Sequence, residues 1–425
     1  MATSPFALDP EESRVFLSGP TNGKRKVSAA LLSPPSSHRS SSSSSSNSST
    51  SIRIRPFDPS TKAPFDLPED TESVACLEFL GYTRKVAEDI FKRWTGRPDP
   101  ERNPDDLIQY ALSYLGRLFF QPLKDLPATQ AMTGLEISDE LQAALTDPHF
   151  SQIFRSQTLH YWLKDTMSIR YSTLNKLLEP GVFESGASSS TQEPPTFTVS
   201  SNIASEDNNL PSAHVTVQAA PLALPDHYIL YKGKAWGDLY GGLLFIRDDG
   251  SVNLRSVQIR EGGDFNHLNS AWYWTLEEAT AEEYRKWGQL RCNWAETWII
   301  QIQVPKTFVD SIRKQQLWYS PDWKEYVWYC RKGNSVGDPP AKFNKSWKAG
   351  QSQLVEGHIC AREPTAIPRI NKEELPEKIT EGDVLNIDGR KATQWAFVDA
   401  EVVERLSNLV RGKIHIEMFP AGYLC

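Results

Sequence analysis

The placement of tryptophan constrains the fold more than any other feature of this sequence. Eleven of the 13 tryptophans follow residue 230, and only Trp94 and Trp162 precede it. A large aromatic side chain buries roughly 150–250 Å² when a chain folds. Residues 225–425 therefore carry enough apolar surface to build a substantial core, and we predict that they form one globular domain.

Short strands are expected at several places in this C-terminal region. Residues 227–233, 243–246, 298–304 and 414–418 are rich in β-branched and aromatic side chains, and apolar and polar residues alternate in the last two. Helices are interspersed among these strands without a regular strand–helix–strand order. This arrangement is typical of an α+β fold.

Two helix starts are predicted from capping patterns in the same region. Thr275 is followed three residues later by Glu278, which fits a capping box. The residues of this helix that are expected to face the core are Ala279, Tyr284 and Trp287. Asp399 is expected to cap a second helix. The apolar residues of that second helix are Val402, Val403, Leu406 and Leu409.

The first half of the chain divides into three regions by composition. Residues 1–65 contain a serine run from Ser40 to Ser46 and few apolar side chains, so we expect a disordered tail. Residues 66–182 carry apolar side chains at helical spacing, which predicts a small helical module. Residues 183–224 are rich in Ser, Pro and Asn, as in a flexible linker.

The distribution of charge bears on the choice of partner. The formal net charge is −7, and residues 63–224 hold 22 acidic against 12 basic side chains. A nucleic-acid-binding surface needs a basic stripe that displaces counterions, and neither predicted folded region supplies one. We therefore expect no nucleic-acid partner, and a protein partner or acceptor for the acidic helical module.

We expect neither a secretory signal nor a membrane-spanning segment. The N-terminus lacks a charged region followed by an apolar run, and no window approaches 18 consecutive apolar residues. The five cysteines have no regular spacing, so we expect reduced thiols and no metal site. We expect a cytoplasmic protein, and the basic cluster Lys24-Arg25-Lys26 leaves a nuclear location open.

Common catalytic motifs are absent, but an ordered series of fragments remains. The sequence has no Gly-rich phosphate loop, no GxSxG and no HExxH. The fragments, in chain order, are Leu230-Tyr231-Lys232-Gly233, Asp264-Phe265, Ala271-Trp272-Tyr273-Trp274-Thr275, the segment 299–304, the segment 323–331, Gly357-His358-Ile359 and Gln394-Trp395-Ala396-Phe397. In order and spacing this series resembles a poorly characterised microbial and fungal branch of the ADP-ribosyltransferase superfamily. The resemblance covers nearly all of residues 225–425.

The resemblance implies a split β-sheet domain that uses NAD as substrate and transfers its ADP-ribosyl group to an intracellular protein or small molecule. Cleavage of nicotinamide passes through an oxocarbenium-like ribose, so such a site holds the dinucleotide bent and stabilises positive charge. By resemblance, Tyr273 stacks against nicotinamide and Gln394 orients the ribose. The residues implied to bind NAD are Tyr231, Lys232, Gly233 and Thr275.

The residue type at position 394 keeps a second function open. An amide donates and accepts hydrogen bonds, but it cannot act as a base or carry negative charge. Lys232 lacks the planar fork of an arginine. The alternative is a non-catalytic binding or scaffold module that keeps the ADP-ribosyltransferase-like fold, has lost the catalytic carboxylate and recruits a partner through the helical region.

Other conspicuous residues of the C-terminal region are expected to be structural. We predict that His358 has a satisfied structural role and that Cys360 is a buried, inert thiol. The aromatic residues between 318 and 329 are expected to pack against a sheet rather than to form a stacking platform for a base.

Overall fold

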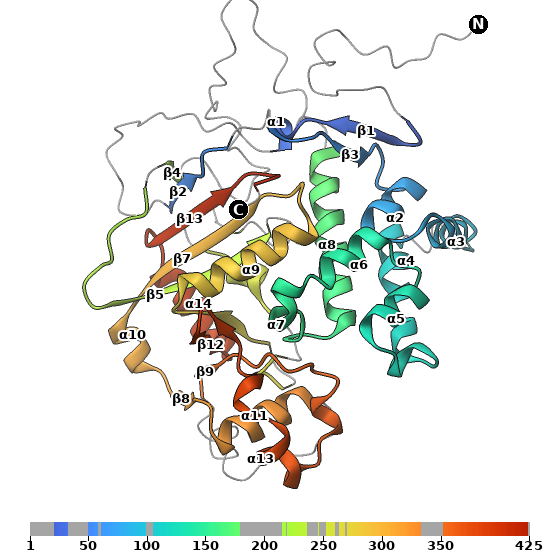
Figure 1. Cartoon of the computed structure of the whole chain (residues 1–425). Coiled ribbons are helices and arrows are strands. Elements are labelled where there is room, and N and C mark those ends of the chain that lie inside the picture. Colours follow the sequence, from blue (N-terminus) through green and yellow to red (C-terminus); the bar gives the residue numbers. More distant parts are fainter. Residues whose placement is uncertain are drawn as a thin grey trace, which may run out of the picture.

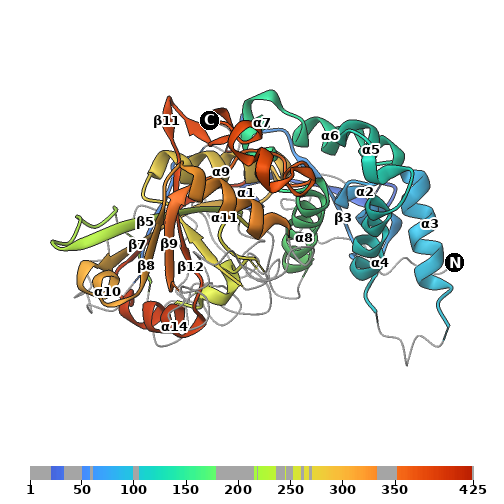
Figure 2. The same ribbon diagram turned by 90° about the horizontal axis from the view of Figure 1, so that it is seen from below.

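The protein is an α+β molecule, as the sequence predicts. The computed structural model describes residues 21–32, 50–57, 61–98, 105–178, 215–217, 219–235, 245, 252–259, 263–267, 270–332 and 352–423. These residues form helices and sheets that contain both parallel and antiparallel pairs (Figure 1). Figure 2 shows most of the strands from residues 227–419 on one side of the molecule and most of the helices from residues 74–178 on the other.

The larger sheet contains five strands. Their order is β4 (Val215–Val217), β2 (Thr50–Ile54), β13 (Ile414–Phe419), β7 (Thr297–Pro305) and β5 (His227–Ala235). β7 pairs antiparallel with both β5 and β13, while β2 runs parallel to β13. The strands predicted at 227–233, 298–304 and 414–418 are confirmed. The one predicted at 243–246 lies outside the described residues, apart from the buried Phe245.

Residues 1–65 are not a tail throughout, contrary to the prediction from composition. β2 lies inside the larger sheet. β1 (Lys24–Val27) pairs with β3 (Phe65–Pro68), and a short helix, α1 (Ala29–Leu32), follows β1 in the chain. The side chain of Ile52 is buried in the core, and Ser51 Oγ lies 2.8 Å from Nδ1 of His415 on β13. Long-range pairing thus orders a short strand next to the serine run, which itself lies outside the described residues.

The smaller sheet contains four strands. Their order is β6 (Trp272–Trp274), β12 (Thr393–Phe397), β9 (Leu354–His358) and β8 (Lys314–Leu317). β12 is central and pairs antiparallel with β6 and β9, while β8 runs parallel to β9. An isolated bridge joins the two sheets, because Tyr231 on β5 and Thr275 after β6 exchange backbone hydrogen bonds of 2.8 and 3.0 Å.

Helix α9 (Glu278–Arg291) packs against β5. Its N-cap is Glu277 instead of the predicted Thr275, because the backbone of Thr275 is paired with Tyr231. Ala279 is exposed, contrary to the prediction, because the buried face of the helix begins at Thr280. Its buried face carries Thr280, Ala281, Arg285, Trp287 and Gly288. The predicted burial of Trp287 is confirmed, and Tyr284 is partly buried.

The remaining helices of the C-terminal region cover the sheets. They are α10 (Lys306–Ser311), α11 (Pro321–Lys332), α13 (Leu375–Lys378) and α14 (Ala400–Leu409), and a small hairpin of β10 (Asn386–Ile387) and β11 (Arg390–Lys391) lies between the last two. The predicted cap of α14 is confirmed, since Asp399 accepts hydrogen bonds from the backbone of Glu401 and Val402 at 2.9 and 3.1 Å.

Residues 74–178 are helical and share a core with the C-terminal region. The helices are α2 (Val74–Leu80), α3 (Arg84–Thr95), α4 (Leu107–Tyr114), α5 (Ala128–Gly134), α6 (Asp139–Leu145), α7 (Ser151–Phe154) and α8 (Leu159–Leu178). Trp162 on α8 and Trp287 on α9 lie in one hydrophobic cluster. The buried guanidinium of Arg170 donates to the Arg291 carbonyl at 2.8 and 3.1 Å, where a cation is favoured by the C-terminal end of α9.

The close approach of α9 to β5 depends on Gly233. A Cβ atom at this position would lie 1.9 Å from the carbonyl oxygen of Ala281. Because the obstacle is helix backbone, we expect Gly233→Ala to lower the free energy of unfolding by about 1–3 kcal/mol, the usual cost of overpacking. Chemical denaturation of the full chain measures this change.

Gly116 supplies the matched control for that substitution. It lies in a 3₁₀ turn (Leu115–Phe119), and no atom of the described residues would come within 4 Å of an added Cβ. Gly116→Ala is therefore expected to change the free energy of unfolding by less than about 0.5 kcal/mol. Equal losses for the two variants would contradict the packing role of Gly233.

Candidate functional site

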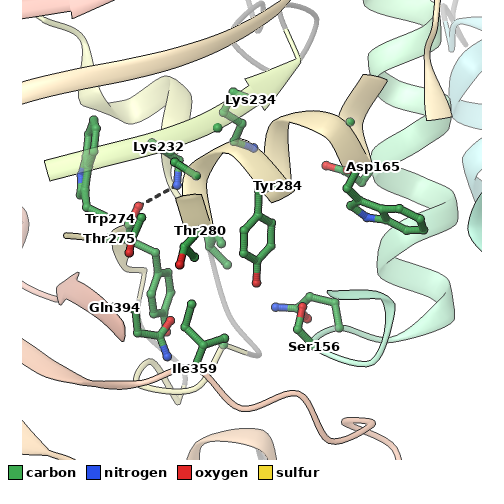
Figure 3. Close-up of a pocket in the computed structure, with 18 of the residues that line it drawn as sticks. Ser156, Asp165, Lys232, Lys234, Trp274, Thr275, Thr280, Tyr284, Ile359 and Gln394 are labelled. Carbon is green, nitrogen blue, oxygen red and sulfur yellow. Dashed lines mark hydrogen bonds between the residues drawn. The ribbon is translucent and has the colours of Figure 1, made fainter. Parts of the chain in front are cut away.

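A cavity lies between β5, β6, α9 and the turn that joins α7 to α8. It contains about 960 Å³ of space not filled by atoms, part of it open to solvent. All six residues that the sequence assigns to a site line this one cavity, namely Tyr231, Lys232, Gly233, Tyr273, Thr275 and Gln394. Folding thus brings together residues more than 160 positions apart, and Figure 3 shows several of them around the same space.

Lys232 extends from β5 along the cavity wall. Its Nζ donates a hydrogen bond of 2.7 Å to the carbonyl oxygen of Tyr273 and lies 5.9 Å from the ring centroid of Trp274. Lys234, two residues further on, lines the same cavity, because alternate residues of a strand share a face (Figure 3). Two ammonium groups on one wall favour a ligand that carries negative charge.

Tyr273 is held by its hydroxyl group. The hydroxyl donates to Oδ1 of Asn266 at 2.6 Å and accepts from the backbone N–H of Phe265 at 2.9 Å. Burial, together with the nearby carboxylate of Asp264, raises the pKa of Tyr273 well above its usual value, so the phenol stays neutral. The residue is only partly buried and lines the cavity.

Gln394 lies on β12 with its amide fixed from behind. Its Nε2 donates to Oδ2 of Asp264 at 2.7 Å and, at 3.4 Å, to the carbonyl oxygen of His358. An amide whose nitrogen is held in this way has its oxygen left as the acceptor. The carboxylate of Asp264 thus lies one hydrogen bond away from this amide.

Asp264 forms a buried ion pair with Arg331 of α11. Both side chains are almost completely buried, at 5% and 1% exposed, and Arg331 Nη2 and Nε lie 2.5 and 2.9 Å from Oδ1. The other carboxylate oxygen also accepts the backbone N–H of Cys360 at 2.8 Å. Each oxygen of this carboxylate therefore accepts two hydrogen bonds, and the positive charge of Arg331 balances its negative charge.

Thr275 and Gly233 have structural roles that the sequence did not indicate. Thr275 Oγ1 donates to Glu277 at 2.5 Å, and the same carboxylate accepts from Thr393 Oγ1 at 2.6 Å, which ties the end of β6 to the start of β12. Gly233 gives α9 room to pack. Tyr231 is partly buried and joins the two sheets through its backbone.

Sequence reasoning missed the residues that the helical region contributes to the cavity. They are Ser156, Gln157, Tyr161, Trp162 and Asp165. No local pattern indicates them, because their contact with the C-terminal region spans more than 60 residues of chain. Lys234 was also missed, although its spacing of two from Lys232 in a predicted strand placed both on one face.

Most of the other conspicuous residues are structural, as predicted. The side chains of Trp323, Tyr326, Trp328 and Tyr329 are buried together with strand residues in one core cluster, whereas Trp318 is 40% exposed, contrary to the prediction. Burial raises the pKa of the Cys360 thiol to about 11, so the group is not a nucleophile at neutral pH. His358 Nδ1 accepts the backbone N–H of Tyr319 at 2.9 Å.

The described part of the chain offers neither a metal site nor a membrane span. Within it, no group of three His, Cys, Asp or Glu side chains is arranged to hold a metal ion. Within the same residues, no helix has the length and apolar character needed to cross a bilayer.

The Asp264–Arg331 pair is predicted to hold the site together. Asp264→Asn removes one partner and leaves a buried guanidinium without its counter-charge, which typically costs about 3–5 kcal/mol. The control is Asp310→Asn, since the pair of Asp310 with Lys314 spans 3.0 Å on the surface. An exposed pair contributes up to about 1 kcal/mol. Urea denaturation of the full chain compares them, and a loss below 1 kcal/mol for Asp264→Asn would contradict the role of the pair.

Similarity to proteins of known function does not identify this site. Comparisons of the chain with models of protein families, with curated proteins and with solved structures find no match. A function for the cavity must therefore be inferred from the residues that line it. They include two lysines, several aromatic rings and a fixed amide, which come from β5, β6, α8, α9 and β12.

Proposed function

We propose that the cavity binds NAD and that the protein transfers the ADP-ribosyl group to an intracellular protein or small molecule. The observation that carries this proposal is the convergence of Lys232, Tyr273 and Gln394 on one cavity. The resemblance to ADP-ribosyltransferases gives each of these three side chains a role in the site. They come from three different strands, so chance proximity along the chain does not explain their meeting.

The charge of the cavity supports a ligand with a pyrophosphate. The charged side chains that line it are Lys232, Lys234, Arg291, Asp165 and Asp264. The two carboxylates each pair with an arginine, at 2.7 Å for Asp165–Arg291 and 2.5 Å for Asp264–Arg331. Lys232 and Lys234 place two further cationic groups on the β5 wall of the cavity, and ammonium groups attract phosphates.

The arrangement of the sheets supports the same family of folds. A split β-sheet is what the resemblance implies, and the C-terminal strands divide into two sheets that meet at the Tyr231–Thr275 bridge. The cavity opens beside this bridge, with β5 from one sheet and β6 and β12 from the other.

The chemistry requires that positive charge on a ribose be tolerated. The bond from C1 of the ribose to nicotinamide breaks, nicotinamide leaves with the bonding electrons, and the acceptor nucleophile forms the new bond and loses a proton to solvent. Gln394 would accept a hydrogen bond from a ribose hydroxyl through its amide oxygen. Tyr273 would offer an aromatic face to nicotinamide.

A non-catalytic NAD-binding module is the second candidate, and one observation favours it. The carboxylate nearest to Gln394 is Asp264, whose charge is already balanced by Arg331. An oxocarbenium-like ribose would then lie beside an amide and an ion pair whose charges cancel, with no free negative charge from this pair to stabilise it. This candidate keeps the binding and omits the transfer.

Titration of the full chain with NAD, followed by assay of released nicotinamide, separates the two candidates. We expect NAD binding and slow nicotinamide release, with release lowered at least about tenfold in Gln394→Ala because one transition-state hydrogen bond is lost. Gln130→Ala, on the exposed face of α5, is the control and should behave as the unmodified chain. Binding without release supports the non-catalytic module, and no binding at millimolar NAD excludes both.

The role of Tyr273 is tested by two variants that differ in the ring. Tyr273→Ala removes the aromatic face and is expected to weaken NAD binding about tenfold, as one stacking contact is worth about 1–3 kcal/mol. Tyr273→Phe keeps the face and loses only the hydrogen bonds to Asn266 and Phe265, neither of which is made to the ligand, so its binding should stay within about threefold. If Tyr273→Phe loses as much affinity as Tyr273→Ala, the ring does not stack on the ligand.

The lysines are tested through the salt dependence of binding. Lys232→Met and Lys234→Met should each weaken NAD binding about tenfold at low ionic strength, because a charge-assisted hydrogen bond contributes about 1.5–3 kcal/mol. Binding of nicotinamide alone should not change. Lys85→Met is the control, since its side chain is 81% exposed on α3. Unchanged NAD affinity in both cavity variants would contradict the placement of the pyrophosphate.

A further inference from the structure

The helical region forms one end of the cavity. Ser156 and Gln157 lie in the turn before α8, and Tyr161, Trp162 and Asp165 lie on its first two turns. In Figure 3, Ser156 and Asp165 face the space from the side opposite Gln394 and Thr275, and Lys232 and Lys234 lie along the wall between these ends. The cavity thus has an amide end, a cationic middle and a helical end.

The helical end is aromatic and carries one carboxylate. Tyr161, Trp162, Tyr284 and Trp287 line it, and the rings of Trp162 and Trp287 meet edge to face with centroids 5.6 Å apart. Asp165 accepts from Arg291 Nη1 at 2.7 Å through one oxygen, Oδ2. Its side chain is 13% exposed and lines the cavity.

This end is held in place before any ligand arrives. Arg170 of α8 donates to the last residue of α9, and Arg331 of α11 donates at 3.2 Å to the carbonyl oxygen of Ser156. The guanidinium of Arg291 also lies 4.9 and 5.2 Å from the rings of Trp162 and Trp287. A wall with so many anchors loses little entropy when a ligand binds.

We propose that the helical end of the cavity is the subsite for the adenosine half of NAD. This inference rests on the proposed function, because it takes the amide end for nicotinamide ribose and the lysines for the pyrophosphate. Adenine is a flat ring that stacks on aromatic side chains. The Asp165 carboxylate accepts from hydroxyls of the adenosine ribose, for which an ionised acceptor is well suited.

The subsite gives the helical region a different role from the one expected from its composition. Its acidic surface predicted a protein partner, whereas Tyr161 and Asp165 make the region part of the ligand site. The order of contacts along the cavity then follows the order of groups in NAD. Ligands that contain only one half of NAD should therefore respond to different substitutions.

Calorimetric titration of the full chain with two half-ligands tests the subsite. ADP-ribose contains the adenosine half, and nicotinamide mononucleotide lacks it. Tyr161→Ala and Asp165→Asn are each expected to weaken ADP-ribose and NAD at least about tenfold, which is about 1.4 kcal/mol. Both variants should keep the affinity for nicotinamide mononucleotide within twofold.

Two further variants separate ligand contact from damage to the fold. Tyr161→Phe keeps the ring and should bind ADP-ribose like the unmodified chain. Gln157→Ala changes a partly buried residue of the turn that lines the cavity, and it should weaken ADP-ribose without affecting the thermal unfolding temperature. Asp165→Asn removes the charge that pairs with the buried Arg291 and can lower the unfolding temperature, so its retained affinity for nicotinamide mononucleotide is the measure that the loss is local.

The outcomes distinguish this inference from the proposed function. If NAD and ADP-ribose bind and none of the helical-end variants weakens ADP-ribose, the subsite is wrong and the proposed function stands. If the variants weaken nicotinamide mononucleotide as much as ADP-ribose, the orientation along the cavity is wrong. If the unmodified chain binds neither NAD nor ADP-ribose, the proposed function and the subsite both fail.

Discussion

The buried pair of Asp264 with Arg331 is the contact on which the geometry of the cavity depends. Asp264 receives the amide of Gln394 from β12 and the backbone N–H of Cys360 after β9. Arg331 donates in addition to the carbonyl oxygens of Cys360 and Ser156. One ion pair therefore fixes the central strand of the smaller sheet, helix α11 and the turn that precedes α8.

An ion pair in this position contributes more to arrangement than to stability. Taking both charges out of water costs several kcal/mol per ion in practice, and mutual attraction offsets that cost only when further hydrogen bonds are made. The pair satisfies this condition, because its carboxylate and guanidinium make hydrogen bonds with five other groups. Apolar residues of similar volume would fill the space equally well, but they would not orient Gln394.

The sequence allowed the strands to be predicted better than the contacts between distant parts of the chain. β-Branched and aromatic side chains identified β5, β7 and β13, with alternation in the last two, and the side chain of Asp399 marked the start of α14. The start of α9 was wrong, because Thr275 has a strand partner that no local pattern indicates. β2 was missed for a similar reason, since its few apolar residues become buried only beside β13.

The site shows the same division between local and distant information. Lys232, Tyr273 and Gln394 belong to fragments with recognisable order, so resemblance alone assigned them to one site, and they do share a cavity. The helical wall had no such fragment, because Tyr161 and Asp165 become relevant only after α8 packs on α9. Residues with a local motif were therefore found, and residues placed by packing alone were not.

The amide at position 394 follows from the carboxylate behind it. A carboxylate there would put a second negative charge about 4 Å from Asp264 or closer, at a cost of about 4 kcal/mol for an effective dielectric constant of 20. Arg331 balances only one such charge, whereas an amide donates to Asp264 at 2.7 Å. That hydrogen bond polarises the amide and makes its oxygen a better acceptor. In a transferase, this polarised oxygen would face the cationic ribose in place of a carboxylate. In a binding module, the same contact would only position the ribose of bound NAD. The two candidates therefore differ in one quantity, which is how much more strongly the amide oxygen interacts with the transition state than with bound NAD.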